Sequence, residues 1–299
     1  MAATARSVPI ADILAEADGL LEPSRFEDYG PNGLQVPGLN GTSHEVSCIA
    51  TGVSASAELF ELATAERADL LLVHHGLFWG SGFTTVDSQL RHRLRLLFDA
   101  DLALAAYHLP LDAHPLLGNN ALLAGALGAT RLDVPFAPHR GEPIGCLARF
   151  GEDTDGGGSN SKGESEGGSG SEGGRGSEKD GVRGVSVGLP LAELIARVRA
   201  ATGDRDPLVF DAGPARVRTL GIVSGGGSDY ISDAARAGAE AFLTGEPVER
   251  AMAQARELGV TYIAAGHYAT ETFGIRALGE HLASRFGLRH VFLDIPNPV

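Results

Sequence analysis

Histidines and carboxylates, the side chains that bind divalent metal ions, gather in three short segments of this 299-residue chain. His74 and His75 are adjacent and end an apolar run, where two imidazoles need hydrogen-bond partners or a metal ion. His267 and Glu271 are four residues apart, so a helix that begins there would project both side chains from one face. Each pattern alone is also common without a metal, in satisfied core histidines or in surface pairs.

The third segment, YHLPLDAHPLLGNN, crowds His108, Asp112 and His114 into seven residues, in a loop that Pro110 and Pro115 stiffen. Imidazole and carboxylate ligands together suit Zn, Fe, Mn or Co. Asp112 and Glu271 are natural bridges, because a carboxylate can bind two ions at once. Two ions roughly 3.5–4 Å apart can generate hydroxide from water and polarise a substrate oxygen. The three segments together predict a pair of divalent ions held by His74, His75, Asp112, His267 and Glu271.

The remaining histidines are isolated in the sequence, and no role is assigned to them: His44, His92, His139, His281 and His290.

Strand-like apolar runs and helical stretches alternate in both halves of the chain, after an expected helix at about 9–21. The runs are 46–53, 68–73 and 102–107, with a helix near 88–99, and then 217–223, 239–243 and 260–265. The phrases AERADLLLVHHG and ARAGAEAFLTGE occupy equivalent places, which indicates an internal duplication of a β-α-β-α-β unit. We therefore expect an α/β fold of two pseudo-repeated lobes with mainly parallel strands and helices on the faces. Ligands gather beyond the carboxyl ends of such strands, so the metal site should lie between the lobes.

Residues 151–181 contain no apolar side chain and are rich in glycine, serine and acidic residues. Such a segment cannot bury enough surface to offset its ordering entropy, so we expect a disordered connector. It lacks the GxxxxGK[ST] pattern of a phosphate-binding loop. The connector separates an N-terminal lobe (1–150) from a C-terminal lobe (182–299), and the two together should form one domain.

The net charge of −14 argues against a nucleic-acid surface, because phosphate binding needs clustered basic residues. No apolar run is long enough to cross a membrane, and the first residues do not resemble a signal peptide. Cys48 and Cys146 lie in apolar runs and form no CxxC pair. We expect both to be reduced core residues of a cytoplasmic protein.

The turn Ser224–Ser228 invites comparison with a dinucleotide-binding loop, but it does not keep the GxGxxG spacing. The better interpretation is a tight turn with Ser228 as a helix N-cap.

At these residues the chain resembles the Nif-three-like family, also known as GTP cyclohydrolase I type 2 homologues. The matching phrases are PNGLQV (31–36), HHGLFW (74–79), HLPLDAHPLLGNN (108–120), TGE (244–246), GHYATE (266–271) and DIPNPV (294–299). The resemblance implies a dinuclear metal centre with the five ligands named above, and His108 as an extra ligand or a proton carrier. It also implies a toroidal homohexamer, a trimer of dimers, with the metal sites facing an internal cavity. Some members insert a separate small domain between the halves; this chain has only the polar segment 151–181 at that point, so it resembles a short member.

The family name implies hydrolytic opening of the GTP purine ring, although the chain has no phosphate-binding loop. We expect a metal-dependent hydrolase acting on a nucleotide or another small molecule, with His108 or Glu246 moving a proton. Glu246 could instead support a ligand or sit favourably at a helix N-terminus. Asn32 and Gln35 either line the substrate site or belong to a simple turn. The alternative function is a non-catalytic metal-binding hexamer that stores or delivers metal or binds regulatory partners.

Overall fold

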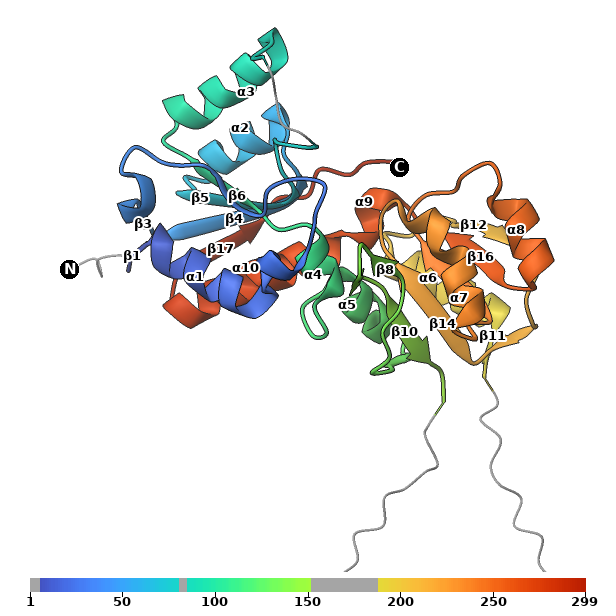
Figure 1. The fold of residues 1–299 in the computed structure, drawn as a ribbon. Coiled ribbons are helices and arrows are strands. Elements are labelled where there is room, and N and C mark those ends of the chain that lie inside the picture. Colours follow the sequence, from blue (N-terminus) through green and yellow to red (C-terminus); the bar gives the residue numbers. More distant parts are fainter. Residues whose placement is uncertain (1–5, 81–84, 152–187) are drawn as a thin grey trace, which may run out of the picture.

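The structure is a computed structural model that describes residues 6–80, 85–151 and 188–299 (Figure 1). Residues 152–181 of the predicted connector lie outside the described residues. The described chain forms a mixed α/β fold built around two sheets.

The first sheet has five strands in the order β17-β4-β5-β6-β2. Their bounds are β17 Arg289–Phe292, β4 Cys48–Ser54, β5 Leu70–His75, β6 Ala103–Ala106 and β2 Gly33–Val36. β17, β4, β5 and β6 run parallel, and β2 closes the edge antiparallel to β6.

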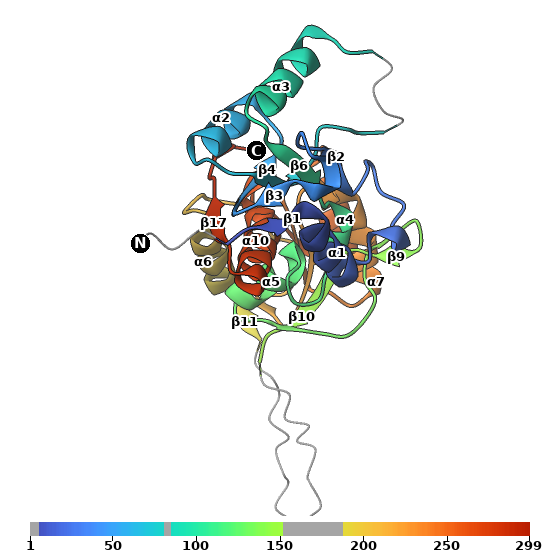
Figure 2. The ribbon, with the colours of Figure 1, turned by 90° about the vertical axis from the view of Figure 1, so that its left-hand side faces the viewer.

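Helices cover both faces of the first sheet, because its strands are apolar on both sides. Leu70 and Leu72 of β5 pack towards α1 and α10, whereas Leu71 and Val73 pack towards α2 and α3. This alternation follows from the two-residue period of a strand. Figure 2 shows α1 and α10 side by side beneath the sheet, with α2 and α3 above it. These helices are α1 Ile10–Leu21, α2 Ala57–Ala65, α3 Ser88–Asp99 and α10 Thr272–Phe286.

The second sheet has six strands in the order β12-β16-β15-β14-β10-β7. Their bounds are β12 Leu208–Phe210, β16 Thr261–Ala264, β15 Ala241–Thr244, β14 Thr219–Val223, β10 Cys146–Arg149 and β7 Thr130–Arg131. Its core faces α5 and α6 on one side and α7 and α8 on the other. These helices are α5 Asn119–Ala126, α6 Leu191–Ala201, α7 Ile231–Arg236 and α8 Ala251–Leu258.

Short elements complete the fold. The two-stranded pairs are β1 Val8–Pro9 with β3 Glu45–Val46, β8 Pro138–His139 with β9 Glu142–Pro143, and β11 Leu189–Pro190 with β13 Arg216–Val217. The short helices are α4 Leu109–Ala113 and α9 His267–Thr270, and the 3-10 turns are η1 Pro23–Arg25, η2 Gly41–Ser43 and η3 Gly227–Tyr230.

Both sheets are mixed rather than uniformly parallel. In the second sheet only β14, β15 and β16 run parallel, while β12, β10 and β7 pair antiparallel. Strand membership also crosses the predicted lobe boundary, since β10 joins the second sheet and β17 joins the first. The internal duplication and the lobes 1–150 and 182–299 therefore stay predictions.

Cys48 and Cys146 are buried and free, as expected. Within the described ranges, no helix is both long and apolar enough to cross a membrane.

Candidate metal centre

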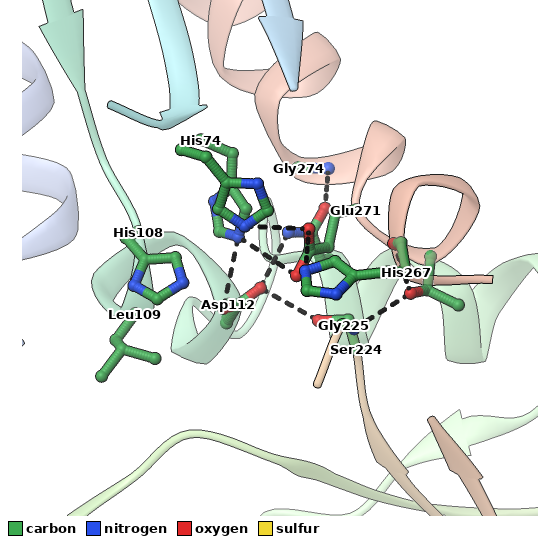
Figure 3. Close-up of polar contacts among 12 residues, drawn as sticks. His74, His108, Leu109, Asp112, Ser224, Gly225, His267, Glu271 and Gly274 are labelled. Atoms are coloured by element: carbon green, nitrogen blue, oxygen red, sulfur yellow. Dashed lines mark hydrogen bonds and ion pairs between the residues drawn. The ribbon is translucent and has the colours of Figure 1, made fainter. Parts of the chain in front are cut away.

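The five predicted ligands come together where strands of both sheets end. His74 and His75 are the last residues of β5, and Asp112 lies in α4, shortly after β6. His267 begins α9 after β16, and Glu271 lies between α9 and α10. The carboxyl ends of the parallel strands of the two sheets thus meet at one site, as the sequence predicts (Figure 3).

Glu271 is the central carboxylate of this cluster. Its Oε2 lies 3.1 Å from His75 Nε2 and 3.2 Å from His267 Nε2. Its Oε1 lies 3.6 Å from His74 Nε2, which is also 3.5 Å from Asp112 Oδ2. Two donor groups therefore share Glu271. We name His74, Asp112 and Glu271 the inner group, and His75, His267 and Glu271 the outer group.

The donor atoms suit divalent cations. In each group the ligand atoms lie within 4.8 Å of one another, as they do in a third set formed by His74, His75 and His108. His74 Nε2 and Glu271 Oε2 are buried, and their contacts with the neighbouring ligand atoms lack hydrogen-bond geometry. Leaving such atoms unpaired costs roughly 1–3 kcal/mol each, a cost that a bound cation would remove.

The other nitrogen of each histidine ligand is held by the protein. His74 Nδ1 donates to the carbonyl oxygen of Tyr107 at 3.0 Å, and His75 Nδ1 lies 2.9 Å from Ser54 Oγ. His267 Nδ1 contacts the carboxylate of Glu246. These contacts turn Nε2 of each ring towards Glu271, the usual arrangement around metal-binding imidazoles.

Asp112 is oriented by side chains from distant parts of the chain. Asn119 Nδ2 and Ser224 Oγ donate to its Oδ1 at 2.8 and 3.0 Å, which leaves Oδ2 for His74. Asn119 Oδ1 in turn accepts from the backbone N–H of Gly274 at 2.6 Å. The network ties α5 to the start of α10 and fixes the carboxylate between them (Figure 3).

His108 is held by Asp28, a residue that the sequence did not single out. Asp28 Oδ1 accepts from His108 Nδ1 at 2.7 Å, and the carboxylate side chain is only 2% exposed. Its Oδ2 accepts from Leu109 N–H and from Asn32 Nδ2, both at 2.9 Å. Burial raises the pKa of Asp28, but the hydrogen bond from His108 and further donors outweigh it and lower that pKa overall. The DYG sequence at 28–30 carries no recognisable motif, so only the fold reveals this pair.

Asn32 and Gln35, the predicted substrate contacts, make internal hydrogen bonds. The amide oxygen of Asn32 accepts from His108 N–H at 2.8 Å. Gln35 donates to Pro31 O and accepts from Leu77 N–H, each at 2.8 Å. A role for either residue in substrate binding stays a prediction.

The charges of the cluster oppose the effect of burial. Burial lowers the pKa of His74, but Asp112 and Glu271 outweigh it and raise that pKa well above its ordinary value. Burial also disfavours protonated His267, yet neighbouring carboxylates raise its pKa to about 9. Burial raises the pKa of Glu271, but His75 and His74 lower it well below the usual range. The carboxylates thus favour a positive charge at this buried site.

The glycine-rich turn lies directly against this cluster. Gly225 has φ +59°, and a Cβ there would lie 2.0 Å from Glu271 Oε1. The prediction that Ser228 is an N-cap is wrong, because it lies inside η3, whose N-cap is Gly226. The Ser228 hydroxyl instead bonds Glu246 O and lies 2.6 Å from Tyr262 Oη. Gly225 is therefore needed because the turn lies too close to Glu271 for a side chain at this position.

A pocket of about 1060 Å³ opens beside the cluster. Its lining includes His75, His108, Asp112, His267 and Glu271. The volume is far larger than two metal ions require and suits a small-molecule ligand.

The chain is similar to known proteins over nearly its whole length. A family model described as Duf34/NIF3 (NGG1p interacting factor 3) matches residues 8–298. The GTP cyclohydrolase 1 type 2 homolog of Pseudomonas aeruginosa is 37% identical over 292 residues, covering 98% of this chain and 99% of the relative. The protein of the same name from Vibrio cholerae is 40% identical over 281 residues, covering 93% and 95%.

Solved structures show the same similarity. A structure of protein ybgI, described as of unknown function, has a TM-score of 0.78 at 36% identity and covers 98% of this chain and 100% of that chain. The structure of TTHA1606 from Thermus thermophilus has a TM-score of 0.75 at 34% identity, with coverage of 98% and 100%.

Proposed function

Because this chain belongs to the Duf34/NIF3 family, we propose that it binds two divalent metal ions and hydrolyses a nucleotide or another small molecule. The sharing of Glu271 between two donor groups carries this proposal. The inner group would hold one ion and the outer group the other, and Glu271 belongs to both groups. Zinc, iron and manganese all suit these donors.

Bound divalent ions would supply Lewis-acid activation of water at this site. The chain itself contributes proton transfer and orientation. Asp28 holds His108 Nδ1, which leaves Nε2 of that ring to exchange a proton at the pocket. Glu246 would contribute to the same proton transfer and orientation through its contact with His267 Nδ1. The pocket beside the outer group favours an enzyme, because a storage site needs no such space.

The second candidate is a non-catalytic metal-binding hexamer that stores or delivers metal or binds regulatory partners. The burial of the inner group favours it, because all three of its residues are buried and closed coordination is typical of structural metal sites. The toroidal homohexamer and a cytoplasmic location are part of both proposals. Light scattering of the purified protein at six times the 31.0 kDa chain mass would support the hexamer.

A turnover screen tests the proposal. The metal-loaded protein is incubated with nucleotides, cyclic amides and phosphoesters beside the variants Asp112→Ala and Asp133→Ala. Asp133 is 98% exposed and serves as the control. We expect turnover of at least one class by the parent and the control, and loss of at least about 100-fold in Asp112→Ala. Turnover that survives Asp112→Ala would exclude the two-metal mechanism, and a silent panel would favour the second candidate.

A further inference from the structure

The outer part of the pocket differs in character from its metal-binding floor. The floor is lined by carboxylates and imidazoles, while the rest of the wall includes Trp79, Tyr29, Arg93 and Arg140. Trp79 is 41% exposed and Tyr29 is 49% exposed, so both aromatic rings offer surface to a ligand.

The two aromatic rings are placed around His108. The Trp79 ring lies 5.1 Å from the His108 ring at an interplanar angle of 84°, and 5.6 Å from the His75 ring. The Tyr29 ring lies 6.0 Å from the His108 ring at 62°. The indole N–H of Trp79 donates to Gly76 O at 3.0 Å, which fixes the ring. A flat ring stacked on Trp79 would therefore lie next to the metal-binding histidines.

The unpaired charge of this wall is positive. The three acidic groups that line the pocket are already engaged: Asp28 by His108, Asp112 by Asn119 and Ser224, and Glu271 by His75 and His267. Arg140 pairs with Glu27. Arg93, half-buried in α3, has no acidic partner in the part of the chain that the structure describes. A guanidinium in such a place is a ready binding group for phosphate or carboxylate.

We infer that this wall binds an anionic molecule with a flat ring, such that Trp79 stacks on the ring and Arg93 pairs with the anionic group. The inference rests on the proposed function, because it places that ligand beside the metal ions. It adds two specificity-determining residues, Trp79 and Arg93. Uncharged cyclic amides and ring-free phosphates would then be poorer ligands than a ring that carries a phosphate.

Trp79 is the single tryptophan of the chain, so its fluorescence reports binding directly at this wall. The metal-loaded full chain is titrated with adenosine 5′-monophosphate, adenosine and inorganic phosphate. We expect the nucleotide to change Trp79 emission at the lowest concentration. Arg93→Met should weaken nucleotide binding about tenfold and leave adenosine unchanged. Arg95→Met is the matched control, because Arg95 is 74% exposed on the same helix and paired with Asp99.

Calorimetry extends the test to Trp79 itself. Trp79→Leu should weaken binding of both nucleotide and adenosine about tenfold, and Trp79→Phe should keep most of it. Equal affinities for nucleotide and adenosine, unchanged binding in Arg93→Met, or an equal loss in Arg95→Met would overturn the inference. Elemental analysis of the same samples reads the metal centre separately. Normal metal content with no role for Arg93 would thus reject the inference alone, and absence of metal would reject the proposed function.

Discussion

The inner and outer groups share Glu271 but are held in different ways. His74 is fully buried, and backbone and amide groups from distant segments orient it and Asp112. The His267 side chain, by contrast, is 28% exposed, and its Nδ1 contacts the carboxylate of Glu246, which is itself 38% exposed. Rigid, buried ligands lose little entropy on binding, whereas exposed ligands leave room for water and substrate. We therefore expect the inner ion to bind more tightly and the outer ion to exchange and to meet the ligand.

The largest effect should come from removing the carboxylate common to both groups. Glu271→Gln keeps the shape of the side chain but removes the bridging charge, so metal content should fall from about two ions per chain to near zero. Elemental analysis after chelator-free purification measures this change. Glu280→Gln is the control, because Glu280 is exposed on α10, the helix that Glu271 directly precedes. A variant that keeps one firmly bound ion would show that the groups do not depend on a shared bridge.

The glycine turn offers a test of the space around that bridge. Gly225→Ala would place a Cβ 2.0 Å from Glu271 Oε1, at a residue whose φ is positive. Most of the metal should therefore be lost, and the free energy of unfolding should fall by about 1–3 kcal/mol. Gly226→Ala is the matched control, since the nearest atom to its Cβ is His267 Cε1 at 4.0 Å. Thermal unfolding and metal analysis check both. Equal behaviour of the two variants would contradict the close packing of Gly225 on Glu271.

Truncating an outer ligand should separate the two groups. His267→Ala removes a partly exposed ligand, so the protein should retain about one ion per chain, in the inner group. His74→Ala removes a buried ligand from the inner group, so it should lose more metal than His267→Ala. It should also lower the free energy of unfolding more, by about 1–3 kcal/mol. Metal analysis and chemical denaturation measure the contrast. If His267→Ala loses both ions, the inner group is not an independent site.

The smallest effect is expected at the pair that lies outside both groups. Asp28→Asn weakens the hold on His108 but touches neither carboxylate ligand, so metal content should stay at about two ions per chain. Metal affinity should fall by no more than about tenfold, the lower range for groups that orient a ligand. Competition with a metal chelator measures affinity, and Asp133→Asn is the exposed control. Complete loss of one ion would instead make His108 an obligatory ligand.

Local patterns predicted most of the elements that carry the site. The Ser88–Asp99 helix has the expected bounds, and the strand-like runs before His74, His108 and His267 all form strands. The prediction fails where an element depends on a remote partner. Ser228 caps no helix, because its hydroxyl is engaged by Glu246 O, from the loop after β15, and by Tyr262 Oη, from β16. The sequence also could not predict which sheet β10 and β17 join, because each pairs with a strand far away in the chain.

The sequence by itself determined which side chains could bind metal and that they follow buried strands. Residue chemistry and the short-range periods of strands and helices are local properties, so His74, His75, Asp112, His267 and Glu271 were recognisable from the sequence. Only the tertiary structure decided that Glu271 stands between two donor groups and that Asp28 holds His108 across 80 positions of chain. It also decided that Arg93 and Trp79 line the same pocket. These arrangements depend on packing between segments far apart in the chain, and at Glu271 on how the two sheets dock, which no local pattern encodes.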